Sequence, residues 1–409
     1  MPEAKPKILM IITLDSKGEE AKFIRGLIEE NGCEVIHLDA SVRRHVSGAE
    51  ISPLDVAAAA GMTIEDVRAL GHEGKCLDAM KKGAVALAVA QNRKTPLSGV
   101  IALGGSMGTS LGSAVMRALP YGIPKVMVST MASGFTVPYV GHSDLAMFNS
   151  VADISGLNRL SRMIFRNAVA AVTGMAKSYQ PIPGHDKPLV LMTTLSTTEK
   201  CVRRVREALE GDGCEVMVFH SNGNGGPTMD SIAAGWDVAA VLDLSLVEVM
   251  DTIQGGLMAG GPERSKAALA RGIPTIFAPG NADFMVGGPL EGAIKQFPGR
   301  RYHVHNPELT AVRSNLDDLK KFADHMAKIT AEAKGPVHFY IPLRGFSNHD
   351  SPDGHIHDPE MPRPFSEYMH KVMPKNVVLR DIDAHLNDPE FADTIIAAAR
   401  GLLAGALKS

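Results

Sequence analysis

The sequence lacks several features that would place it in a special class of protein. Its four cysteines are scattered, with no C-x-x-C pair. This argues against a disulfide framework or a zinc knuckle and indicates reduced, mostly buried thiols. Lysine and arginine form no long run and the formal charge is -3, so nucleic acid is not an expected partner.

Long apolar runs are also absent. No stretch reaches the roughly 20 apolar residues that span a bilayer, and the amino terminus shows neither a secretory apolar region nor a cleavage site. We therefore expect a cytoplasmic protein with no membrane partner. Its 409 residues exceed a single ordinary core, so two domains are expected.

One pattern occurs twice along the chain. Residues 7–13 form a short apolar run typical of a buried parallel strand, and Ser16 with Glu19 predicts a capping box for the next helix. The segment that starts at residue 188 repeats this pattern without a gap, with "TL" and "GCEV" at the same separation in both copies. We infer an internal duplication.

In each half, strands alternate with helical stretches, which predicts an α/β fold with a doubly wound parallel sheet. The expected architecture is two Rossmann-like domains related by the duplication. Residues 177–188 have the proline and polar content of a linker. This gives an N-terminal nucleotide-binding domain at 1–183, with a helical insertion at about 42–94, and a C-terminal domain at 184–409.

The segment "GGSMGTS" at residues 104–110 follows a predicted strand and opens a helix. Ligands of open α/β sheets collect beyond the carboxyl ends of the strands, and glycines let backbone N–H groups approach an anion there. The spacing matches neither G-x-G-x-x-G nor the P-loop, so a turn needed only for packing is the alternative. The hydroxyl-rich residues 129–134 favour phosphate. The predicted contacts are Thr13, Gly104, Gly105, Ser106, Gly108, Thr109, Ser129, Thr130, Ser133 and Gly134.

Three charged residues that follow strands are candidates for catalysis. Lys17 would neutralise phosphate, and Asp15 would hold a metal-bound water or a substrate hydroxyl, although a lysine at such a position is usually solvated. The second half has Ser196 and Thr198 at the equivalent positions, so the two crevices are not expected to be equivalent. Asp243 ends a predicted strand, where its carboxylate would face the crevice or cap a helix.

Histidine and aspartate are concentrated in residues 344–360. Imidazole and carboxylate groups are metal ligands, but the segment has no i, i+4 spacing and no zinc signature. We therefore favour a polar loop stiffened by prolines, with a metal site as the alternative. The candidate ligands are His349, Asp350, His355, His357 and Asp358.

Long segments of the chain resemble one known family, in the same order. They include "TLDSKGEE" from residue 13, "GGSMGTSLGSAVMRALPYGIPKVMVSTMASG" from residue 104 and "DSPDGHIHDPE" from residue 350. The chain resembles the ATP-binding-domain proteins named after the tomato mosaic virus resistance protein. The resemblance implies two Rossmann-like domains, a homodimer, and ATP with magnesium bound by the N-terminal domain. Met107 stands where the family pattern has a glycine.

The segment "YVGHSDLAMFNSVADISGLNRLSRMIFRNA" from residue 139 belongs to the same resemblance. Its polar residues, Asp144 among them, are expected to line the cleft or the dimer interface, since the segment follows directly from the loop at residues 129–134. Helix caps and surface ion pairs are the alternative for these residues.

Three functions stay open from the sequence. The first is an ATP- and magnesium-binding enzyme of small-molecule metabolism with its active site between the two domains. The second is a nucleotide-stabilised regulatory binding protein without turnover. The third is an ATP-independent, metal-assisted lyase or hydrolase that acts on a phosphorylated or carboxylated substrate.

Overall fold

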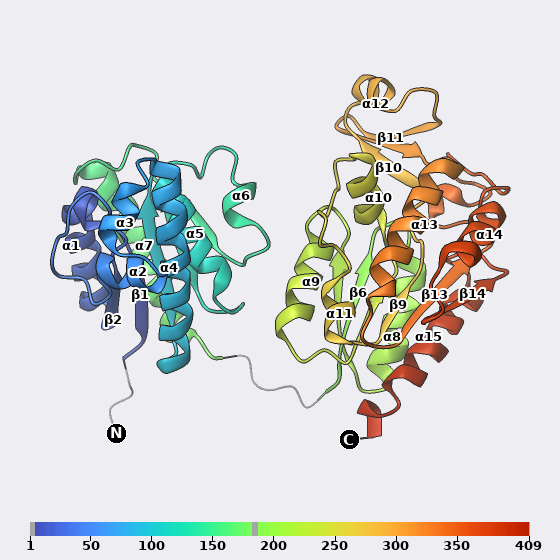
Figure 1. Ribbon diagram of the computed structural model, residues 1–409, viewed down its shortest axis with the longest axis horizontal. Helices are drawn as coiled ribbons and strands as arrows, with labels where there is room; N and C mark the ends of the chain where they lie inside the picture. The colour runs from blue at the N-terminus through green and yellow to red at the C-terminus, as the bar shows by residue number, and fades with distance from the viewer. Residues whose placement is uncertain (1–4, 182–186, 409) are drawn as a thin grey trace. The chain divides into compact units, whose positions relative to one another are not determined.

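The computed structural model describes residues 5–181 and 187–408. Contacts divide the chain into two compact units, Met1–Pro183 and Gly184–Ser409. The predicted boundary between residues 183 and 184 lies outside the described residues. Each unit has its own parallel sheet and its own hydrophobic cores (Figure 1), so the predicted α/β fold with two Rossmann-like sheets is confirmed.

The sheet of the N-terminal unit is parallel, and its three central strands are buried on both faces. Its strands are β1 (Lys7–Ile11), β2 (Glu34–Leu38), β3 (Gly99–Gly104), β4 (Lys125–Ser129) and β5 (Ala146–Asn149). They lie in the order β2-β1-β3-β4-β5. The winding direction reverses between β1 and β3, and at such a switch point the loops diverge and leave a crevice at the carboxyl edge.

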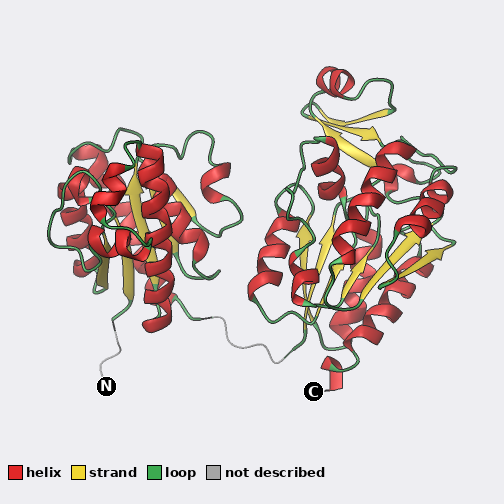
Figure 2. Ribbon diagram, viewed as in Figure 1, coloured by secondary structure: helices red, strands yellow, loops and turns green. Residues whose placement is uncertain are grey.

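Helices cover both faces of this sheet (Figure 2). Because side chains alternate along a strand, Ile8 and Met10 pack with α1 (Leu14–Glu30) and α7 (Arg159–Ser178), whereas Leu9 and Ile11 pack on the opposite face. That second face is covered by α4 (Glu73–Lys94) and α5 (Ser106–Ala118). The short helices are α2 (Pro53–Ala59), α3 (Ile64–Ala69) and α6 (Val137–Val140).

The predicted helical insertion corresponds to α2, α3 and α4. Capping boxes begin the first two, with Ser52 and Thr63 as N-cap residues, and such caps stabilise short helices. Helix α4 crosses α2 at Gly83, where a Cβ atom would overlap the carbonyl oxygen of Val56. Only glycine permits this close crossing.

The C-terminal unit contains a six-stranded parallel sheet. Its strands are β6 (Leu189–Thr194), β7 (Glu215–His220), β8 (Ala240–Asp243), β9 (Thr275–Phe277), β13 (Val337–Pro342) and β14 (Val377–Ile382). They lie in the order β14-β13-β9-β8-β6-β7. Read from β7, the first four strands repeat the order found in the N-terminal unit, as an internal duplication predicts.

A small antiparallel sheet is inserted between β9 and β13. It consists of β10 (Phe284–Gly287), β11 (Tyr302–Asn306) and β12 (Leu309–Arg313), in the order β10-β12-β11. In Figure 1 it lies with α12 at one end of the unit, next to α10. The helices are α8 (Glu199–Gly211), α9 (Gly225–Gly235), α10 (Val247–Gln254), α11 (Ala267–Arg271), α12 (Leu290–Gln296), α13 (Leu316–Ala331), α14 (Pro362–Val372), α15 (Pro389–Leu403), and the 3-10 turns Asn348–Asp350 and Ala406–Lys408.

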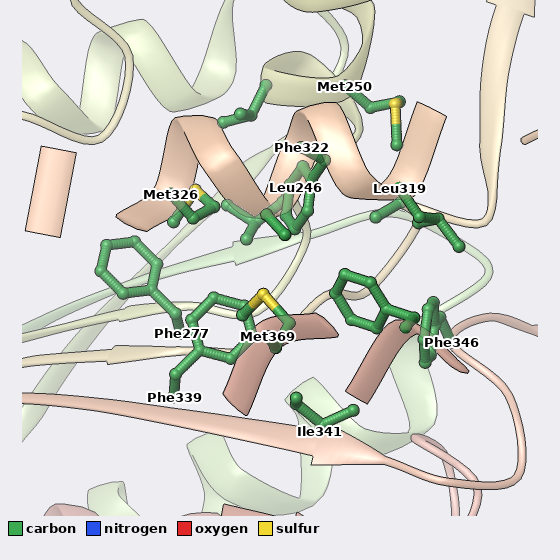
Figure 3. Packing of buried hydrophobic residues seen from close by; sticks show 14 of the residues in the cluster. Leu246, Met250, Phe277, Leu319, Phe322, Met326, Phe339, Ile341, Phe346 and Met369 are labelled. Carbon is green, nitrogen blue, oxygen red and sulfur yellow. The ribbon is translucent and has the colours of Figure 1, made fainter. Parts of the chain in front are cut away.

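Aromatic side chains and methionines fill the largest core of this unit. Phe277 and Phe339 from neighbouring strands stack with ring centroids 6.1 Å apart. Phe322 of α13 and Met369 of α14 pack over these strands in the same cluster (Figure 3). Among the described helices of both units, none is long and apolar enough to cross a membrane.

Candidate functional site

A pocket of about 600 Å³ opens at the carboxyl edge of the N-terminal sheet, at the switch point between β1 and β3. The loops after β1, β2 and β3 meet there, and α4 forms one wall. Its charged and hydroxyl-bearing lining consists of Thr13, Asp15, Ser16, Lys17, Ser41, Arg43, Arg68, His72, Glu73 and Ser106. Its apolar lining includes Cys76, Leu77, Met80, Leu103 and Leu111. The structure therefore joins the two predicted loops at residues 13–18 and 104–110 in one pocket.

The glycine loop, residues 104–110, begins α5 without a side-chain cap. Gly105 is the N-cap residue, and no side chain caps this helix, so its first N–H groups lack partners of the kind found at capped helices. A Cβ on Gly104 would lie 2.6 Å from the Cα of Gly108. Packing alone therefore requires glycine at position 104, which is the alternative to anion binding that the sequence left open. Met107 lines the pocket with 42% of its surface exposed.

Asp39, at the end of β2, organises the first loop. Its Oδ1 accepts hydrogen bonds from the backbone N–H of Leu14 at 3.1 Å and from the hydroxyl of Ser41 at 2.5 Å. Ser41 Oγ in turn accepts from the N–H of Asp15 at 3.1 Å, and Asp15 Oδ2 accepts from the N–H of Arg43 at 3.0 Å. This chain of bonds fixes Asp15 at the pocket. Asp39 was not predicted from the sequence, although a carboxylate at a strand end was the signal that selected Asp243.

Lys17 lines the pocket, but its ammonium group already has a partner. Its Nζ donates to the carbonyl of Ile154 at 2.6 Å, and its backbone departs from helical geometry inside α1. The predicted capping box of Ser16 and Glu19 is wrong. The helix begins at Leu14, and Ser16 Oγ lies 3.0 Å from Thr13 Oγ1 instead.

The loop at residues 129–134 lies beside the glycine loop. Ser129 Oγ is 2.6 Å from Thr109 Oγ1, and both side chains are fully buried, so this pair joins α5 to β4. Thr130 donates its N–H to the Gly104 carbonyl at 3.3 Å, while Ser133 and Gly134 are exposed in the following turn. The described lining of the pocket includes none of the residues from 129 to 134.

Asp144 lies at the opposite, amino-terminal edge of the same sheet. Its Oδ1 is 2.6 Å from the Nζ of Lys125, the first residue of β4, and its Oδ2 accepts from the N–H of Gly122 at 2.7 Å. The Lys125 side chain is buried, so Asp144 neutralises an internal cation. The structure thus places it away from the pocket, in the role of an ion-pair partner.

Asp243 also has a buried partner that the sequence did not indicate. Arg264 binds it with two bonds, from Nη1 at 2.7 Å and from Nη2 at 2.9 Å, and donates from Nε to Glu248 at 2.8 Å. Burial would lower the pKa of Arg264, but the surrounding carboxylates raise it. Burial raises the pKa of nearby Asp230 to about 7. Asp243 itself is fully buried, and both of its carboxylate oxygens accept hydrogen bonds from Arg264.

Buried polar side chains also tie together the loops at the switch point of the C-terminal sheet. Asn281 donates to Thr197 Oγ1 at 2.5 Å and accepts from Ser245 Oγ at 2.7 Å. All three are buried. The corresponding edge of the N-terminal sheet carries the pocket, so the two switch points differ in structure.

The predicted metal ligands of the C-terminal unit do not converge on one point. Asp350 pairs with Arg313 at 2.9 Å, and Asp358 with Arg301 at 2.8 Å. His357 Nδ1 contacts the backbone oxygen of Asp350 at 2.8 Å. Within the part of the chain that the structure describes, no three such side chains stand ready to hold a metal ion.

His349 and His355 have a different neighbour, His303 of β11. The His303 ring stacks on His355 with centroids 4.0 Å apart and lies 4.7 Å from the ring of His349. Burial and the nearby histidines lower the pKa of His349 to about 4. No local sequence signal marks this group, because His303 lies about 50 residues upstream on a strand that was not predicted.

Known proteins are similar in sequence to both units of this chain. Models of the N-terminal and C-terminal domains of the uncharacterised protein family UPF0261 match residues 6–181 and 187–403. A UPF0261 protein of Clostridium tetani is 38% identical over 402 residues, which cover 97% of this chain and 98% of that protein. One of Mesorhizobium japonicum is 34% identical over 393 residues, covering 96% of this chain and 98% of that protein.

A plant protein is also related. The ToMV resistance protein Tm-1(GCR237) of Solanum lycopersicum is 32% identical over 419 residues, which cover 96% of this chain and 55% of the tomato protein. The family models match both units, and the two bacterial relatives cover 97% and 96% of this chain. This chain, with its two Rossmann-like units and the pocket at the first switch point, is therefore a member of the UPF0261 family.

Proposed function

We propose that the N-terminal unit binds ATP with magnesium in the pocket at the β1/β3 switch point, and that the protein is an enzyme of small-molecule metabolism that uses this nucleotide. The observation that carries the proposal is the uncapped start of α5 inside a pocket of about 600 Å³. A helix start with free N–H groups and a positive dipole end favours phosphate.

The lining suits the rest of the nucleotide. Arg43 and Arg68 bring positive charge to the pocket, and guanidinium groups bind phosphate through paired N–H donors. Cys76, Leu77 and Met80 of α4 supply an apolar surface of the kind that purine rings contact.

The oxygen-bearing side chains of the first loop fit magnesium. Asp15 has one carboxylate oxygen that accepts from the Arg43 N–H, and its second oxygen is available for a cation or its water. Magnesium prefers carboxylates together with phosphate oxygens. When bound, it would neutralise phosphate charge, while Asp15 and Lys17 would position the reacting groups.

Calorimetry with magnesium and ATP tests the binding part of the proposal. We expect saturable binding, and we expect Arg68→Ala to weaken it by about tenfold, the effect of one lost charge-assisted hydrogen bond. Lys81→Ala is the matched control, because Lys81 lies on α4 and pairs with Asp78. A protein that binds no ATP at millimolar nucleotide would contradict the proposal.

Turnover tests the enzyme part separately. ADP release is measured with ATP and a panel of hydroxylated and carboxylated small molecules. Asp15→Asn should abolish release and leave the fold unchanged. ATP binding with no release in any reaction would favour the regulatory alternative over an enzyme.

A further inference from the structure

We propose that the exposed face of α7 in the N-terminal unit docks an acidic amphipathic helix of another protein. Helix α7 packs on the face of the sheet that carries Ile8 and Met10. Its other side faces solvent and contributes no residue to the described lining of the pocket. The proposal is therefore independent of the proposed nucleotide binding.

The charges of α7 are all of one sign. The helix contains no aspartate or glutamate, and its four cations are Arg159, Arg162, Arg166 and Lys177. At 3.6 residues per turn, these four positions fall within an arc of about 60°, and all four side chains are exposed. They form a cationic row that runs from the first turn of the helix to the last.

An apolar stripe lies beside the cationic row. Met163, Ala170 and Gly174 fall within the adjoining arc of about 40°, and all three are exposed. Met163 has 63% of its surface exposed, although α7 has a separate buried face that includes Phe165 and Val169. A Cβ on Gly174 would meet nothing within 4 Å, so a second helix can pack closely here. Amphipathic helices are recognised through apolar contacts of this spacing.

The arginines of the cationic row lack acidic partners. Arg162 and Arg166 lie over the ring of Phe23 of α1, with their Cζ atoms 5.0 and 5.6 Å from the ring centroid. Among the described residues, no carboxylate forms an ion pair with either arginine. Elsewhere, the exposed Arg204 binds Asp393 with two hydrogen bonds of 2.8 and 2.9 Å. The guanidinium groups of α7 are thus held in position with N–H donors that suit carboxylates.

An acidic helix fits these charges better than a second copy of the chain or a membrane. Two α7 faces in contact would bring their cations together with no carboxylate between them, and like charges oppose association. A planar anionic membrane would also meet α1, where Glu19 and Glu30 are exposed on the same side as Phe23. A single helix that lies along α7 meets only the cationic row and the apolar stripe.

Fluorescence anisotropy with the full-length protein tests this surface. The probe is a labelled synthetic peptide of about five helical turns, with leucines along one face and glutamates beside them, and lysines replace the glutamates in a control peptide. We expect saturable binding of the acidic peptide that weakens as salt is raised, and no binding of the control peptide. Arg162→Glu should lower the affinity about tenfold, because an attraction becomes a repulsion. Arg93→Glu is the matched control variant, since Arg93 is exposed in the last turn of α4 and should leave the affinity unchanged.

The outcomes separate an acidic helix from the other occupants. Equal binding of the two peptides, or unchanged affinity in Arg162→Glu, would overturn the proposal. A dimer that dissociates in Met163→Asp, measured by sedimentation, would also overturn it, as would binding to phosphatidylglycerol vesicles in place of the peptide. Unfolding temperatures check the fold, because Arg162 contacts Phe23. If Arg162→Glu does not fold, Met163→Asp replaces it, since that exposed side chain should also contribute about tenfold to the affinity.

Discussion

A single buried aspartate, Asp251, makes the stability of the C-terminal unit depend on pH. Asp251 of α10 accepts hydrogen bonds from the N–H groups of Met258 at 2.9 Å and Val286 at 3.0 Å, yet burial raises its pKa to about 7. Between the pKa of about 4 in the unfolded chain and this value, the folded protein holds a proton that the unfolded chain has lost. The contribution of Asp251 to stability therefore falls as pH rises through that window.

Replacing Asp251 tests this dependence. Relative to Asp251→Asn, the wild-type protein should lose stability between pH 5 and pH 7, by at most about 1.4 kcal/mol per pH unit. Urea unfolding is followed by the fluorescence of Trp236, the one tryptophan of the chain, which lies in the same unit.

The difference in stability between wild type and Asp251→Asn isolates Asp251 from the other groups that titrate. Burial lowers the pKa of His385 and of His349, so these rings reduce stability as pH falls and oppose the aspartates. The histidines are common to both proteins, and their effect cancels in the difference. Parallel pH profiles of wild type and Asp251→Asn would contradict the prediction.

For single residues, the sequence indicated which side chains follow a strand but not which side chains they contact. Strand ends were visible as apolar runs followed by polar residues, and the structure places Asp15, Lys17 and the glycines at 104, 105 and 108 around one pocket. The partner of Asp243 is a single arginine in a polar loop, and no periodic pattern marks it. Tertiary contacts of this kind depend on chain paths that local spacing does not encode.

Elements with strong local signals were predictable, and those with weak signals were not. The buried parallel strands of both units have apolar runs, and the predicted alternation with helices is confirmed. The antiparallel strands β10, β11 and β12 are four or five residues long, and β11 mixes histidines with one valine, so no clear period of two appears. The start of α1 was misplaced because Asp39, a distant residue, binds the Leu14 N–H and overrides the local capping signal.

Two glycines inside helices, Gly83 and Gly174, allow the close crossing of α4 and α2 to be tested against a control. Alanine normally stabilises a helix interior over glycine by up to about 1 kcal/mol. Gly83→Ala should instead destabilise the N-terminal unit by about 1 to 3 kcal/mol, because the new Cβ overlaps the Val56 carbonyl oxygen where α4 crosses α2. Thermal unfolding monitored by circular dichroism measures the change.

The control is Gly174→Ala in α7. A Cβ at Gly174 would meet nothing within 4 Å, so this variant should be neutral or slightly more stable. Equal effects of the two substitutions would show that the crossing of α2 and α4 is less close than described.

The whole molecule consists of two units with separate cores. The apolar clusters of residues 8–176 and of residues 190–403 are each formed within one unit. The repeated "TL" and "GCEV" segments made this division predictable, because a duplicated βαβ pattern implies two sheets. The hydrogen bonds that tie the loops at the second switch point were not predictable, since they depend on side chains from several loops.

Separate expression tests this organisation. Residues 1–181 alone should fold with a single cooperative transition and bind ATP within about threefold of the full chain. Residues 187–409 alone should fold and show no nucleotide binding. An N-terminal unit that is unfolded in isolation would contradict the prediction, as would ATP binding by the C-terminal unit.

The close crossing at Gly83 also bears on how a ligand reaches the pocket. Helix α4 carries Cys76, Leu77 and Met80 in the pocket wall, and at Gly83 its backbone packs directly against the Val56 carbonyl of α2. We therefore expect this contact to hold the apolar wall in place before any ligand arrives. Association should proceed as one fast step without a slow rearrangement, and little ordering entropy is lost when the ligand binds.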